Sequence, residues 1–211
     1  MSAIFFNLDA LIDYNDLFVE AMSKTVTSFS KEPIDPDLVA ATSGTSIREA
    51  LQLLTGADQE KFLIEAQEIY FKTFTDLTLQ KGKLRDGVPD VLRALQKKGV
   101  KIGYYTNRPG ETLEQVVNHF SLQQFTDVFI AEDEAEARPA PDMLEFLIEQ
   151  LGAEDDDKLL VCAVALDIEM GIRAEIPTVA FPNGSNTARV LRAFNTDFII
   201  EHLAEVLPLV G

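Results

Sequence analysis

The stretch Ala3-Ile4-Phe5-Phe6-Asn7-Leu8-Asp9-Ala10-Leu11 determines how the chain is organised. Its first four residues form a short apolar run, which is typical of a buried strand in a parallel sheet. Two polar side chains, Asn7 and Asp9, follow where that strand is expected to end. Ligands bind at the carboxyl ends of strands in open α/β sheets, so these two side chains are the first candidates for a functional site.

The rest of the core alternates strand patterns with helix patterns. Apolar runs rich in Val, Ile, Phe and Tyr predict further buried strands at 101–105, 127–131, 159–165 and 177–181. Amphipathic patterns predict helices at 88–98, 111–120 and 142–151. An Asn183-Gly184 turn signal follows the last strand run. This order predicts an α/β fold with a doubly wound, Rossmann-like parallel sheet.

One long segment interrupts the alternation, because residues 15–79 contain only helix patterns. These patterns predict helices at 17–29, 37–41, 47–54 and 60–79. Prolines after the first helix and glycines at the exit supply loop residues, namely Pro33, Pro36, Gly82 and Gly87. We therefore expect an inserted α-helical domain at 15–81 and an α/β core formed by residues 1–14 and 82–211.

Composition and charge restrict the possible partners and location. The 211 residues are 46% hydrophobic and 25% charged, which suits a soluble globular protein. Eighteen basic and thirty-five acidic side chains give a net charge of −17, which disfavours nucleic acids and anionic membranes as partners. The single cysteine, Cys162, excludes an internal disulfide and fits a reducing compartment, so we expect a cytoplasmic protein. No apolar run predicts a signal peptide or a membrane span.

Four elements at the predicted strand ends together resemble the haloacid dehalogenase superfamily. In chain order they are Phe6-Asn7-Leu8-Asp9, Tyr105-Thr106-Asn107, Arg138-Pro139-Ala140-Pro141-Asp142 and the strand leading to Asp167-Ile168. With the helical insertion after the first element, the chain is similar to the phosphoglycolate phosphatase and β-phosphoglucomutase group, whose members carry a helical cap at that place. The resemblance covers essentially the whole chain and implies phosphoryl transfer assisted by Mg²⁺.

The resemblance assigns a catalytic role to each matching position, and the residue at the first position, Asn7, cannot perform its role. An aspartate attacks phosphorus in such enzymes at the position of Asn7, and an amide cannot do so. The aspartate that acts as general acid and base is retained as Asp9. Thr106 keeps the hydroxyl that binds a phosphoryl oxygen, and Asn107 follows it as in many relatives. Without the resemblance, Thr106 and Asn107 are a strand end entering a turn before Pro109.

The third and fourth elements also depart from the family pattern. A lysine precedes Pro-x-Pro in such enzymes, and Arg138 keeps its charge with a different geometry. Alternatively, Arg138 is a solvent-exposed residue that leads a helix. When Asp167 is aligned with the second aspartate of the fourth element, the magnesium ligand falls on Ala163, whose methyl group cannot bind metal. Asp167 and the backbone carbonyl of Asp9 are then the remnants of a metal site.

The helical insertion contains one further candidate. The segment Ser43-Gly44-Thr45-Ser46-Ile47-Arg48-Glu49 resembles the substrate-specificity loop of related caps, in which an arginine can reach an anionic substrate. The same residues fit a helix capping box between Ser46 and Glu49, which would leave Arg48 in solvent. Both arrangements can hold together. Arg48 and Arg138 would then form an anion site that needs no metal.

These substitutions predict a degenerate family member that is catalytically impaired or inactive and binds a small anionic metabolite or a protein partner. Losing one indispensable catalytic group commonly costs on the order of a thousandfold in rate, and several are lost here. We expect no cofactor, and a monomer or homodimer. The alternative is an active phosphatase or phosphomutase-like hydrolase with a non-standard site, in which Asp9, Asp167 and a residue of the helical cap substitute for the missing groups. Only this alternative requires Mg²⁺.

Overall fold

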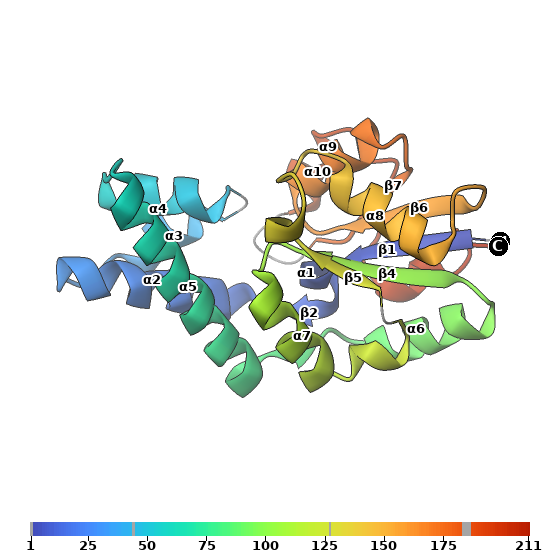
Figure 1. Ribbon diagram of the computed structural model, residues 1–211, viewed down its shortest axis with the longest axis horizontal. Coiled ribbons are helices and arrows are strands. Elements are labelled where there is room, and N and C mark those ends of the chain that lie inside the picture. Colours follow the sequence, from blue (N-terminus) through green and yellow to red (C-terminus); the bar gives the residue numbers. More distant parts are fainter. Residues whose placement is uncertain (1, 44, 127, 183–186) are drawn as a thin grey trace. The chain divides into compact units, whose positions relative to one another are not determined.

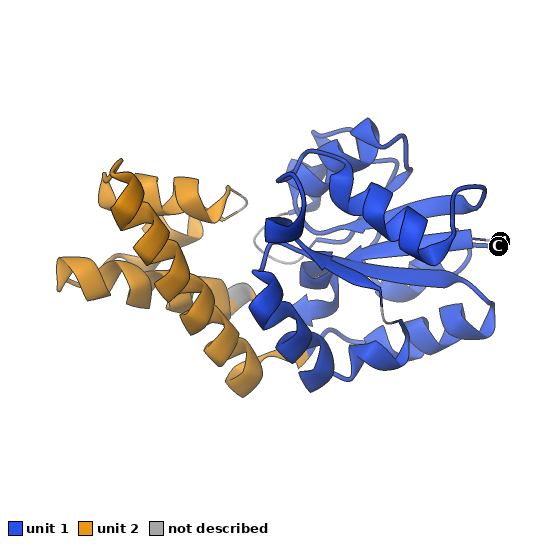
Figure 2. Cartoon of the chain, in the orientation of Figure 1, with its two compact units in different colours: residues 1–13, 84–211 blue, residues 14–83 orange. Residues whose placement is uncertain are grey.

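The computed structural model describes residues 2–43, 45–126, 128–182 and 187–211. The chain divides into two compact units (Figure 2): unit 1 comprises Met1–Asp13 and Leu84–Gly211, and unit 2 comprises Tyr14–Lys83. The expected turn at Asn183-Gly184 lies outside the described residues, and so does residue 127, the first of the predicted strand at 127–131. Every helix in the described ranges is too short or too polar to span a membrane.

Unit 1 is built on a six-stranded parallel sheet with the strand order β5-β4-β1-β6-β7-β8 (Figure 1). The strands are β1 (Ser2–Asn7), β4 (Lys101–Thr106), β5 (Phe129–Ala131), β6 (Asp157–Cys162), β7 (Thr178–Ala180) and β8 (Phe198–Ile199). In the central strand, Phe5 lies level with Gly103 of β4 and Leu160 of β6. The strand order reverses at β1, so the carboxyl ends of β1, β4 and β6 meet at a switch point. The predicted doubly wound sheet is confirmed.

Helices cover the two faces of this sheet. Figure 1 shows α8 (Asp142–Leu151), α9 (Ala165–Arg173) and α10 (Ala188–Arg192) on one face and α6 (Val88–Lys97) on the other. The remaining helical elements are α1 (Leu8–Leu11), α7 (Gly110–His119), η1 (Leu122–Gln124), η2 (Glu132–Glu134) and η3 (Leu203–Val206). Helix α9 approaches the sheet so closely that a Cβ atom on Gly171 would lie 2.4 Å from Cγ2 of Thr178. Only glycine fits this position without a shift.

In its described residues, 14–43 and 45–83, unit 2 contains the four helices α2 (Asn15–Ser30), α3 (Pro36–Ala40), α4 (Ile47–Thr55) and α5 (Glu60–Lys81). Helices α2 and α5 pack along each other. Aromatic rings form part of the core: Tyr70 stacks on Phe74 with ring centroids 5.4 Å apart, and Phe29 meets Phe62 at 4.7 Å. Burial of such large rings stabilises this helical unit.

The chain leaves unit 1 and returns to it at neighbouring positions. Strands β2 (Ile12–Asp13) and β3 (Lys83–Leu84) form a two-stranded sheet. Just beyond it, the backbone N–H of Arg85 donates to the carbonyl of Leu11 at 2.9 Å. Arg85 also donates to the carbonyl of Pro182 at 2.7 Å, and its guanidinium carbon lies 3.4 Å from the centroid of the Phe181 ring. These contacts fix the returning segment to unit 1.

The predicted strand at 159–165 is wrong beyond Cys162. Ala163 and Val164 form a bend, and Ala165 begins α9. The carboxylate of Asp167 accepts hydrogen bonds from the N–H groups of Ala163 and Val164, so it ends the strand and caps the helix. The sequence analysis also did not predict α9, α10, β8 or the β2–β3 pair.

Candidate functional site

Three neighbouring strands of unit 1 bring candidate residues to one edge of the sheet. Asn7 ends β1, Thr106 ends β4, and Cys162 ends β6 directly before Ala163. Strand β1 pairs with both β4 and β6. Asp9 follows two residues after Asn7 in α1. The first, second and fourth sequence elements therefore meet at the switch point of the sheet.

Asn7 is only 1% exposed, and its amide is bound at both ends. Its Oδ1 accepts a hydrogen bond from the backbone N–H of Asp9 at 2.9 Å, and its Nδ2 donates to Oδ2 of Asp167 at 2.8 Å. A flipped amide would place oxygen against a carboxylate oxygen and NH₂ against an N–H group, so these two partners fix its orientation. Asn7 therefore presents a nitrogen donor to Asp167.

Asp167 is fully buried, and its carboxylate accepts four hydrogen bonds. Oδ2 accepts from Nδ2 of Asn7 at 2.8 Å and from the backbone N–H groups of Ala163 at 3.0 Å and Val164 at 3.2 Å. Oδ1 accepts from Nη1 of Arg138 at 2.6 Å in an ion pair. Both carboxylate oxygens are therefore bound by N–H donors, and Oδ2 has more donors than its two lone pairs.

Arg138 connects Asp167 to a second carboxylate, that of Glu132. Its Nε donates to Oε2 of Glu132 at 2.9 Å, and its side chain is only 5% exposed. Burial disfavours the charged guanidinium, but the attraction of Asp167 and Glu132 outweighs this cost and raises the pKa of Arg138. Arg138 is thus a buried, permanently charged group, and the alternative of a solvent-exposed residue is wrong. Its peptide bond to Pro139 is cis.

Asp9 lies at the same edge with one oxygen uncommitted. Its side chain is half-buried, and Oδ1 has no hydrogen-bond partner within the ranges that the structure describes. Burial raises the pKa of Asp9, and the positive charges of Arg108 and Arg138 oppose this shift without cancelling it. A carboxyl group with a raised pKa is able to hold a proton closer to neutral pH than an exposed aspartate.

The sequence analysis missed Arg108, which is fully buried and within electrostatic reach of Asp9. Its backbone N–H donates to Oγ1 of Thr106 at 3.3 Å, so the buried Thr106 hydroxyl supports the turn after β4. Asn107, between them, is half-buried. The sequence signal that could have identified Arg108 is its position in a strand-end turn, directly after the candidate residues Thr106 and Asn107. Its burial is informative only in the structure, since a fully buried arginine is almost always paired.

These side chains do not fit a magnesium ion. Mg²⁺ requires oxygen ligands in nearly ideal octahedral geometry, usually including one or two carboxylates. Both oxygens of Asp167 are already bound by N–H donors, Asn7 presents nitrogen to it, and Ala163 contributes only a methyl group. Within the described ranges, no three His, Cys, Asp or Glu side chains are grouped so that they could hold a metal ion.

Two other side chains, Arg48 and Cys162, have structural surroundings that account for them. Arg48 lies in unit 2, where its Nη1 donates to Oε1 of Glu60 at 3.0 Å. Ser46 and Glu49 form the capping box at the start of α4. A role of Arg48 in binding an anionic substrate stays a prediction. Cys162 is buried, and burial raises the pKa of its thiol, which disfavours a reactive thiolate.

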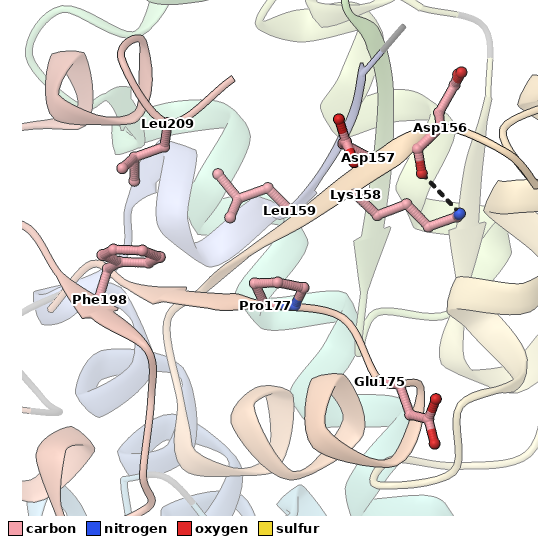
Figure 3. Close-up of a pocket in the computed structure, with 8 residues that line it drawn as sticks. All are labelled: Asp156, Asp157, Lys158, Leu159, Glu175, Pro177, Phe198 and Leu209. Carbon is pink, nitrogen blue, oxygen red and sulfur yellow. Dashed lines mark hydrogen bonds between the residues drawn. The ribbon is translucent and has the colours of Figure 1, made fainter. Parts of the chain in front are cut away.

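A pocket of about 390 Å³ lies at the opposite end of the strands in unit 1 (Figure 3). Residues at the amino ends of β6, β7 and β8 and near the end of the chain line it, namely Asp156, Asp157, Lys158, Leu159, Glu175, Pro177, Phe198 and Leu209. Nζ of Lys158 donates to the carbonyl of Asp156 at 2.9 Å. None of the candidate residues lines this pocket, so its volume is separate from the strand-end site.

Comparisons with known proteins agree with this architecture. A pyrophosphatase PpaX from Listeria innocua is 26% identical over 218 residues, which span 100% of this chain and 96% of that protein. A PpaX from Bacillus cereus is 24% identical over 213 residues, spanning 100% of this chain and 97% of that protein. The crystal structure of a HAD hydrolase of family IA, variant 3, from Entamoeba histolytica superposes with a TM-score of 0.86 at 15% identity, covering 99% of both chains.

The family model for haloacid dehalogenase-like hydrolases matches residues 4–181. This range includes the helical insertion, the strands that end in Asn7 and Thr106, and the helix α9 that carries Asp167. The match covers most of the chain, and the chain therefore belongs to the haloacid dehalogenase-like hydrolase family.

Proposed function

We propose that this family member has lost phosphoryl-transfer activity and acts by binding another molecule. The observation that supports the proposal is the 2.8 Å hydrogen bond from Nδ2 of Asn7 to Asp167. Related enzymes carry the attacking carboxylate at the position of Asn7. An amide nitrogen is a poor nucleophile, and this nitrogen is also committed as a donor to a buried carboxylate.

The charges at the strand ends favour a protein partner over a phosphorylated metabolite. The charged side chains considered at the strand ends are two arginines, Arg108 and Arg138, and three acids, Asp9, Glu132 and Asp167. Their summed charge is −1 when Asp9 is ionised and 0 when Asp9 is protonated. A phosphate ester needs an excess of positive charge. The net charge of −17 would instead complement a basic protein surface. We place this partner in the cytoplasm, since the buried thiol of Cys162 suits a reducing compartment.

A turnover assay tests the loss of activity. Purified protein is incubated with a generic phosphate ester or with pyrophosphate, the substrate that the names of the PpaX relatives suggest, in the presence of Mg²⁺, Mn²⁺ or Co²⁺. We expect neither the wild type nor the Asn7→Ala variant to release phosphate above a protein-free blank. Metal-dependent release that Asn7→Ala abolishes, or a covalent phosphorylated intermediate at position 7, would refute the proposal.

A ligand screen tests the choice of partner. Anions that bind only the folded chain must raise its melting temperature. We expect no saturable rise with a panel of phosphorylated and carboxylated metabolites. A saturable rise that depends on Arg108 would instead favour a small anionic metabolite as the ligand.

One observation favours a second candidate, an active hydrolase with a non-standard site. Asp9 has a raised pKa and an oxygen without a hydrogen-bond partner among the described residues, which is the profile of a general acid or base. In such an enzyme Asp9 would activate water directly, without a covalent intermediate. This candidate requires phosphate release that Asp9→Asn abolishes and Asn7→Ala leaves intact.

A further inference from the structure

We infer that the guanidinium group of Arg138 takes the place of a resident metal ion at the strand ends, so that the folded chain needs no divalent cation there. The inference concerns stability and metal dependence rather than turnover. It can therefore fail while the proposed function stands, and the reverse is also true.

The buried carboxylate of Asp167 is the group at the strand ends that most needs a cation. A fully buried carboxylate is costly unless a positive charge and hydrogen-bond donors compensate it. Nη1 of Arg138 supplies the charge at 2.6 Å, and Asn7, Ala163 and Val164 supply three neutral N–H donors. Both oxygens of this carboxylate are therefore bound by N–H donors, three on Oδ2 and one on Oδ1, where an arginine cation stands in the place that a metal ion would need.

Arg138 also joins segments that are far apart in the sequence. Its Nη1 binds Asp167 in α9, and its Nε binds Glu132 in η2, which follows β5. Asp167 in turn holds Asn7 at the end of β1. Three strand ends are therefore connected through one cation, as they would be through a shared metal ion. The planar fork of arginine reaches two carboxylates with separate N–H groups, and the point charge of lysine does not reproduce this geometry.

A double-mutant cycle measures the ion pair directly. The variants are Arg138→Met, Asp167→Asn and the double variant, and the readout is the equilibrium constant of unfolding in denaturant. We expect a coupling of more than about 30-fold, because removing one partner leaves a buried group uncompensated. Arg138→Lys should recover only part of the loss caused by Arg138→Met.

The exposed pair between Arg93 and Asp90 is the matched control. Its atoms are 2.7 Å apart, almost the same separation as in the buried pair, but the two side chains are 54% and 84% exposed. The corresponding cycle of Arg93→Met and Asp90→Asn should give a coupling below about fivefold. A buried pair with no more coupling than this control would overturn the inference.

Metal dependence is measured on the wild-type chain, so the test does not rely on the variants folding. Melting curves are recorded in a chelator and in millimolar Mg²⁺, with ionic strength matched by monovalent salt because the chain is strongly acidic. We expect the same melting temperature in both conditions. A saturable rise in the melting temperature of the wild-type chain with Mg²⁺ would overturn the inference.

Discussion

Replacing Asn7 by Asp should destabilise the chain. The substitution removes the donor that lies 2.8 Å from Oδ2 of Asp167 and puts a carboxylate oxygen in its place. Loss of a hydrogen bond to a charged acceptor costs about 1.5–3 kcal/mol. Two like charges at this separation repel by about 4–6 kcal/mol at an effective dielectric constant of about 20. Arg138 offsets part of the repulsion, so we expect a net loss of about 3 kcal/mol in the free energy of unfolding near pH 8.

The loss of unfolding free energy caused by Asn7→Asp should increase as pH rises. Burial and the charge of Asp167 raise the folded-state pKa of the introduced carboxyl group above its unfolded value of about 3.9. A raised folded-state pKa gives stability that is present below the unfolded pKa and lost as pH rises through the folded pKa. The difference between the Asn7→Asp variant and the wild type should therefore be smallest near pH 4 and largest near pH 8.

Thermal unfolding across this pH range is the assay. A loss of about 3 kcal/mol corresponds to a fall of about 6–12 °C in melting temperature for a chain of this size. Asn118→Asp, the same change at an exposed position of α7, is the matched control and should stay within about 0.5 kcal/mol of the wild type. A variant at Asn7 that is as stable as the wild type at every pH would refute this reasoning.

The same variant also tests whether one substitution can restore activity. Ala163 and Arg138 would still be unsuited to a metal ion, so we expect no Mg²⁺-dependent release of phosphate from Asn7→Asp. Robust Mg²⁺-dependent hydrolysis would show that the nucleophile position was the only barrier to catalysis.

Three further predictions concern other positions. Asp9→Asn should raise the melting temperature near pH 8, because the pKa of Asp9 is raised above its ordinary value of 3.8, and the gain should disappear in melting curves recorded below that value. Gly171→Ala should cost about 1–3 kcal/mol in denaturant unfolding, because the new Cβ would lie 2.4 Å from Thr178; unchanged stability would contradict the close packing of α9. Ser46→Ala should cost about 1 kcal/mol in the same measurement, because it removes the capping box with Glu49.

Hydrophobic periodicity predicted the sheet because each long buried strand is an apolar run and most flanking helices are amphipathic. It failed at the end of β6, where Ala163, Val164 and Ala165 are as apolar as a strand. The strand ends there because Asp167 accepts hydrogen bonds from two backbone N–H groups, which no local pattern reveals. Strand β8 has only two residues, too few for a periodic signal.

The candidate positions at the strand ends could be found from the order of the motifs, but their partners could not. Asn7 and Asp167 are 160 residues apart in the sequence, and Arg138 and Asp167 are 29 apart. A charged residue before a proline gives no indication that its guanidinium is shared between the buried carboxylate of Asp167 and the partly exposed one of Glu132. Arg108 was missed for a related reason, since an arginine in a turn is usually solvated.

The return of the chain beside its point of departure has an evolutionary consequence. Every strand of the six-stranded sheet lies in unit 1, and the backbone of Arg85 is hydrogen-bonded to Leu11 on the outgoing segment. Recombination at these two adjacent points could therefore exchange one insertion for another of different length without changing the strand order of the sheet.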